Sequence, residues 1–235
     1  MVKKKRSYDA PEPTPTVGDA VQRVARAAVS IIPGVGGAVS QLLEVVFGTP
    51  LARRQQEWRE AVAETLHRLE EERGIRPEDL SENEAFIDAT LQATQIAMRI
   101  SQQERLNALR AAIFNAALPN APDQSIQQMF LAHIDALTVW HLRVLDLFND
   151  PPTWFNRNGR AVPHHVSASS LGQTLEEAYP ELRGHRAFYE VVWADLHVRG
   201  LVNTQTLPGN MSPQGALESR TTGMGRSFLA FIAQS

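Results

Sequence analysis

Residues 27–43 read Ala-Ala-Val-Ser-Ile-Ile-Pro-Gly-Val-Gly-Gly-Ala-Val-Ser-Gln-Leu-Leu, without one charged side chain. Proline stops a helix because it lacks the backbone N–H, and glycine has a weak helical preference. We therefore expect two short apolar helical arms around a glycine hinge. The hinge and its neighbours form the candidate site for membrane or oligomer contact, which consists of Ile31, Ile32, Pro33, Gly34, Val35, Gly36, Gly37 and Val39.

Three settings suit such a hairpin: a buried helical core, a membrane, and an interface between copies of the chain. Small residues allow close helix approach in each of them. A straight transmembrane helix is not expected, because the uncharged run is shorter than the roughly 20 residues that span a bilayer and Pro33 divides it. A phosphate-binding loop is not expected either, because no Lys-Ser/Thr pair follows the glycines. No cofactor is assigned.

The composition excludes cysteine chemistry and gives the chain a small negative net charge. The 235 residues carry a net charge of −3 and include no cysteine, which excludes disulfides and a cysteine nucleophile. Residues 1–16 are basic, then proline-rich, and are predicted to be a disordered tail and not a secretory signal. We expect a cytoplasmic protein, with the inner membrane surface as the alternative place because basic residues are attracted to anionic lipid.

Residues 17–119 are predicted to form a helical domain built from the hairpin and two long amphipathic helices. The first long helix begins at Thr49-Pro50 and ends at Gly74, which are typical start and stop signals.

The second long helix is predicted from about residue 82 to about residue 118. Ile87, Leu91 and Met98 lie on its expected apolar face. The apolar pattern lapses at residues 101–103, so one helix of roughly 50 Å and two shorter helices both fit the sequence.

Residues 120–235 are predicted to form a second domain. Helical patterns cover residues 137–148, 171–178, 184–199 and 222–232, and extended segments are expected at 200–204 and 220–222 around a turn at Pro208-Gly209-Asn210.

This order of elements resembles the winged-helix superfamily. The residues that carry the resemblance are Leu196-x-x-x-Gly200-Leu201-Val202 and Thr221-Thr222-x-x-Gly225-Arg226-x-Phe228-Leu229. The resemblance implies a mainly α fold, a helical bundle or hairpin domain followed by a winged-helix-like module with a small two-stranded β-wing. It also implies that Phe188, Val191, Val192 and Leu196 of the third helix point inward.

In winged-helix proteins the third helix usually enters the DNA major groove. Arg183, Arg186 and Arg199 are the candidate nucleic-acid contacts. From residue 120 onward, however, the chain has eight arginines, no lysine and ten acidic residues. DNA affinity depends on a basic face, so a protein partner is at least as well supported as DNA.

No motif indicates an enzyme or a metal site. His164-His165 is the sole adjacent histidine pair, and a zinc site there would need ligands from elsewhere, such as His133 or His141. We expect no catalytic residue, no metal ligand and no small-molecule substrate.

The chain as a whole also resembles bacterial helical effector proteins of the abortive-infection type, in which a helical body precedes a Gly-Leu-Val … Thr-x-x-Gly segment. We therefore expect a non-enzymatic bacterial effector or scaffold, related to antiphage defence, that acts by self-association or membrane interaction of the hairpin. The alternative is a winged-helix DNA-binding transcriptional regulator.

Overall fold

The computed structural model describes residues 49–163, 169–207, 209 and 211–234. The chain divides into two compact units, residues 1–60 and residues 61–235, and the boundary falls inside the first described helix. The predicted tail, the glycine-hinged hairpin and the pair His164-His165 lie outside the described residues. The predicted domain boundary near residue 120 stays a prediction.

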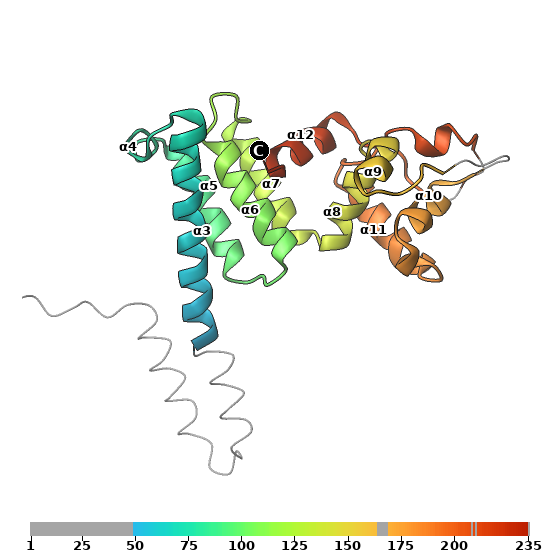
Figure 1. Ribbon diagram of the computed structural model, residues 1–235, viewed down its shortest axis with the longest axis horizontal. Helices are drawn as coiled ribbons and strands as arrows, with labels where there is room; N and C mark the ends of the chain where they lie inside the picture. Colours follow the sequence, from blue (N-terminus) through green and yellow to red (C-terminus); the bar gives the residue numbers. More distant parts are fainter. Residues whose placement is uncertain (1–48, 164–168, 208, 210, 235) are drawn as a thin grey trace, which may run out of the picture. The chain divides into compact units, whose positions relative to one another are not determined.

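The described residues are mainly helical, which confirms the expected mainly α fold, and they contain no β-strand (Figure 1). The α-helices in these ranges are α3 (Thr49–Arg73), α4 (Pro77–Leu80), α5 (Glu84–Ala97), α6 (Gln103–Ala116), α7 (Gln124–Ala136), α8 (Val139–Leu147), α9 (Pro151–Arg157), α10 (Leu171–Ala178), α11 (Arg186–Val198) and α12 (Gly223–Ile232).

The predicted two-stranded wing is wrong. The segments expected to pair meet at one isolated antiparallel bridge between Val202 and Thr221, and neither segment continues as a strand. The pairing consists of Asn203 N–H to Arg220 O at 2.8 Å and Thr222 N–H to Leu201 O at 3.0 Å.

The ladder does not extend because the Arg220 N–H, which would donate to the Asn203 carbonyl in a ladder, is bonded elsewhere. The Thr204 carbonyl accepts a hydrogen bond from the Trp193 indole at 2.9 Å. The Arg220 N–H donates to the Phe148 carbonyl at 2.8 Å. The two segments are therefore held to the helices more than to each other.

The predicted helices of the C-terminal part are confirmed, within two residues at their ends, by α8, α10, α11 and α12. Their caps have the expected chemistry: the Ser170 hydroxyl accepts from Gln173 N–H at 3.2 Å, and the Thr222 hydroxyl accepts from Gly225 N–H at 2.9 Å. Large apolar side chains close the core between these helices, namely Leu145, Phe148, Leu171, Leu175, Trp193, Leu196 and Phe228.

Residues 82–118 form two helices and not one long helix. Helix α5 ends at Ala97, the chain reverses direction, and helix α6 begins at Gln103. The two helices lie side by side (Figure 1). Their buried faces are rich in alanine, which lets the backbones approach closely. The buried alanines are Ala89, Ala93 and Ala97 in α5, and Ala108, Ala111, Ala112 and Ala116 in α6.

The apolar face predicted for α5 is therefore wrong. Leu91 is 56% exposed and Ile87 is 37% exposed, while Phe86, Ala93 and Ile96 are buried. Two apolar stripes fit the same sequence, and the one that packs against α6 and α7 is the alanine-rich one.

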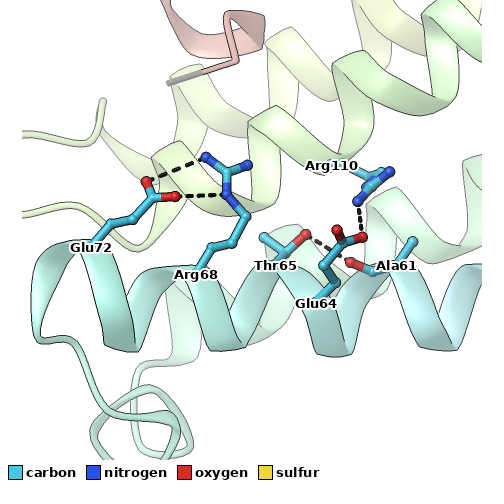
Figure 2. A network of polar contacts seen from close by, with 6 residues as sticks. All are labelled: Ala61, Glu64, Thr65, Arg68, Glu72 and Arg110. Carbon is cyan, nitrogen blue, oxygen red and sulfur yellow. Dashed lines mark hydrogen bonds and ion pairs between the residues drawn. The ribbon is translucent and has the colours of Figure 1, made fainter.

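Polar contacts join residues 61–73 of α3 to α6 (Figure 2). Glu64 forms an ion pair with Arg110, and Arg68 binds Glu72 one turn further along α3 at 2.8 Å. The Arg68 guanidinium also lies 5.1 Å from the centroid of the Phe114 ring. Leu69 is fully buried beside these contacts.

Helix α12 packs against α6, α7 and α8. Phe130 of α7 lies 5.5 Å, ring to ring, from both Phe228 and Phe231 of α12. The Asn115 amide of α6 donates to Phe231 O at 2.9 Å and to Ala233 O at 3.1 Å, so it satisfies carbonyls at the end of α12.

Candidate interaction surface

Helix α11 presents an apolar stripe to solvent. Val198 is 83% exposed, Val191 is 69% exposed and Phe188 is 44% exposed. Ala187 and Ala194 are exposed as well. At 100° per residue these five positions share one face about a third of the helix circumference wide. We call this face the α11 stripe.

The opposite face of α11 holds the helix in place. Tyr189, Val192, Trp193 and Leu196 are buried, and the Trp193 ring lies 5.0 Å from the Phe148 ring. The Tyr189 hydroxyl donates to Glu176 at 2.8 Å. Burial and this hydrogen bond raise the pKa of Tyr189 to about 12, so the phenol stays protonated. The exposed stripe therefore stands on a fixed helix.

The expectation that Phe188 and Val191 point inward is wrong, whereas Val192 and Leu196 are buried as expected. Tyr189 and Trp193 were missed as core residues. The spacing Tyr189, Val192, Trp193, Leu196 is itself a helical i, i+3, i+4, i+7 pattern, and it was the signal for the buried face.

Ion pairs flank the α11 stripe on both sides. Arg186 binds Glu190 at 2.7 Å along one edge, and Arg199 binds Asp195 at 3.1 Å along the other. The hydrogen bond to Glu190 raises the pKa of Arg186 further. Each edge therefore carries one positive and one negative charge, and the stripe between them has none.

The three arginines predicted as nucleic-acid contacts do not form a basic face. Arg186 and Arg199 sit at opposite ends of α11, about 20 Å apart along the axis at 1.5 Å per residue, and each is neutralised by an acid. Arg183 precedes the helix, is exposed, and makes no ion pair with any residue that the structure describes. One free arginine is a small electrostatic footprint for DNA.

Trp140 of α8 extends the apolar area next to Phe188. The two rings meet edge to face with centroids 6.4 Å apart. Trp140 also contacts Tyr179 edge to face at 5.4 Å, and the Arg143 guanidinium lies 5.2 Å from its ring centroid. Aromatic and arginine side chains of this kind are enriched at protein interfaces.

Two buried histidines lie under this region. The ring Nδ1 of His141 accepts the Thr138 N–H at 3.1 Å, so Nε2 carries the proton and faces Asp195 at 3.3 Å. Burial is the main cause that lowers the pKa of His141 and of His133. Thr138 is the N-cap of α8 and His141 its third residue, so this contact is a helix cap.

His133 and His141, the histidines that a zinc site at His164-His165 would have needed in addition, are both buried. Among residues 49–163, 169–207 and 211–234, no group of three His, Asp or Glu side chains is arranged to hold a metal ion. The same ranges contain no helix long and apolar enough to cross a membrane. The predicted hairpin site, Ile31 to Val39, lies outside these ranges.

Comparison of the chain with protein-family models, with curated proteins and with solved structures finds no match.

Proposed function

We propose that this chain is a non-enzymatic bacterial effector or scaffold that acts by self-association, with the α11 stripe as a contact between copies. The observation that carries the proposal is the exposure of Phe188, Val191 and Val198 on a helix whose other face is locked in the core. Contiguous exposed apolar side chains rimmed by polar ones are typical of protein interfaces.

A second copy is the partner that the charges favour. In a two-fold interface each surface meets itself, so a surface with net charge repels its copy. The α11 stripe is uncharged and both its edges are neutral pairs. The net charge of −3 over 235 residues adds little repulsion between copies.

A single 13-residue helix face is small beside the roughly 800 Å² per partner of a standard interface. Association through the α11 stripe is therefore expected to be weak and dependent on concentration. The uncharged residues 27–43 supply a second association element in this proposal, either between copies or at the inner face of the bacterial membrane. The defence role rests on the resemblance to abortive-infection effectors alone.

Sedimentation velocity of the full chain over a hundredfold concentration range tests the proposal. The wild type is expected to shift from monomer to a larger species, and Val191→Glu is expected to remain monomeric. Leu91→Glu is the matched control, since Leu91 is an exposed apolar residue on α5, and it should behave like the wild type.

Three results would argue against this function. A wild type that stays monomeric at every concentration contradicts self-association. If Val35→Glu loses association and Val191→Glu keeps it, the α11 stripe is not the contact between copies. Salt-dependent retention on DNA that is lost in Arg183→Gln would support the winged-helix regulator instead.

A further inference from the structure

A pocket of about 750 Å³ lies between α6, α8 and α12, away from the α11 stripe. Its size falls within the range of small-molecule sites in proteins. Each helix contributes residues at helical spacing, such as Glu104, Asn107 and Ala108 from α6 and Leu142 and Asp146 from α8. The pocket is thus framed by rigid elements.

Positive charge exceeds negative charge in the pocket wall. Arg143 pairs with Glu104, and Arg157 pairs with Asp146. A hydrogen bond from its own backbone N–H, followed by the Arg143 contact, keeps the pKa of Glu104 below its usual range, so that pair stays charged. Arg226 is the third arginine of the wall, and it has no carboxylate partner among the described residues.

Only one of the three guanidinium nitrogens of Arg226 makes a hydrogen bond to a described residue. Its Nη1 donates to the Thr221 carbonyl at 2.8 Å, which leaves Nε and Nη2 without a partner in the described residues. The single hydroxyl hydrogen of Thr221 is shared between the Phe148 carbonyl at 3.1 Å and Asn149 Oδ1 at 3.2 Å. Asn149 Nδ2 has no hydrogen-bond partner among the described residues. Thr221 thus contacts both Arg226 and Asn149, which line the same pocket and carry N–H donors that no described residue accepts.

Much of the remaining wall is apolar, and Asn107 and Gln234 are its other polar residues. Leu229, Ala230 and Ala233 follow Arg226 along α12 at i+3, i+4 and i+7, and Leu142 of α8 also lines the pocket. A ligand held by Arg226 would therefore have an apolar surface beside it along the same helix.

We propose that this pocket binds a small organic acid whose carboxylate is held by Arg226 and Asn149 and whose apolar body lies along Leu142 and Leu229. Arginine presents a planar pair of donors that matches a carboxylate. The site is independent of the self-association proposed above, since it shares no residue with the α11 stripe.

Isothermal titration of the full chain with hexanoate, hexanol and inorganic phosphate tests this site. Hexanoate is expected to bind more tightly than either of the others, because hexanol lacks the charge and phosphate lacks the apolar body. Arg226→Gln should weaken hexanoate binding at least about tenfold, as expected for the loss of a charge-assisted hydrogen bond. Leu229→Ala should weaken hexanoate binding and leave phosphate binding unchanged.

Arg183→Gln is the matched control, because Arg183 is an exposed arginine outside the pocket. Its hexanoate affinity should equal that of the wild type, and a thermal melt of each variant checks that it is folded. Equal binding of hexanol and hexanoate, an equal loss in Arg183→Gln and Arg226→Gln, or no heat with hexanoate at tens of millimolar would overturn the proposal.

Discussion

Gly225 allows helix α12 to lie close to the backbone of Leu201, which follows α11. A Cβ atom built there would lie 2.3 Å from the Leu201 carbonyl oxygen and 2.6 Å from Thr221 Cγ2, closer than real atoms pack. The glycine of the Thr-Thr-x-x-Gly pattern is therefore required by the distance between α12 and the segment after α11.

We expect Gly225→Ala to lower the free energy of unfolding by about 1–3 kcal/mol, the cost of overpacking in a close-packed core. Urea denaturation measures it. Gly223→Ala is the control, because a Cβ at Gly223 meets nothing within 4 Å. Equal midpoints for the two variants would show that α12 does not approach Leu201 so closely.

The buried histidines make stability depend on pH. The pKa values of His133 and His141 are lowered from 6.5 chiefly by burial, with Arg199 lowering and Asp195 raising both. The unfolded chain thus takes up protons near pH 6.5 that the folded chain takes up only at lower pH. Stability is expected to fall as pH drops below about 6.5, and the fall ends below the folded pKa values.

Urea midpoints between pH 7.5 and pH 5 measure this dependence. His133→Leu, which cannot titrate, should flatten the fall by roughly half, since one of two buried histidines is removed. His67→Leu, at an exposed position on α3, is the matched control and should keep the wild-type slope. A slope in His133→Leu that equals the wild type would contradict the assignment.

At the scale of elements, α5 and α11 share a property. Each carries two apolar stripes, one buried and one exposed to solvent. Leu91 and Val191 are exposed, whereas Ala93 and Val192 are buried. Periodicity found both helices, but it could not choose the face, because the choice depends on which neighbours the chain brings against them.

A pair of substitutions tests the orientation of α5. We expect Ala93→Leu, at a fully buried position, to destabilise the protein by about 1–3 kcal/mol through overpacking against α6 or α7. Leu91→Ala should change the free energy of unfolding by less than about 0.5 kcal/mol, as is usual for exposed positions. Thermal unfolding measures both. The reverse order of effects would restore the apolar face predicted from the sequence.

At the scale of the unit formed by residues 61–235, contacts between segments far apart in the sequence hold helix α12 in place. Asn115 of α6 donates to the carbonyls of Ala230, Phe231 and Ala233, more than 110 residues later in the chain. Helix α12 therefore depends on α6 both for its packing and for its C-terminal cap.

We expect Asn115→Ala to reduce stability by about 1 kcal/mol, the typical net value of a hydrogen bond, and to lower the protection of α12 amides against hydrogen exchange first. Asn158→Ala is the control, because the Asn158 amide donates within its own helix end, to Trp154 at 2.8 Å. Uniform loss of protection in all helices would show that Asn115 supports the whole unit and not α12 in particular.

The sequence by itself determined the helical class and, within two residues, the ends of α8, α10, α11 and α12. These depend on propensities, on proline and glycine, and on side chains that bond within three or four residues. The sequence also indicated that the arginines of residues 120–235 are outnumbered by acids.

Only the tertiary structure decided which faces are buried, where the wing fails and which arginines are free. The wing fails because the Phe148 carbonyl binds the Arg220 N–H that a ladder would need, and Phe148 is far from Arg220 in the sequence. Likewise Arg186 and Arg199 are paired, while Arg226 is left with unused donors beside Asn149. Such outcomes follow from contacts between residues far apart in the chain, and periodicity carries no information about them.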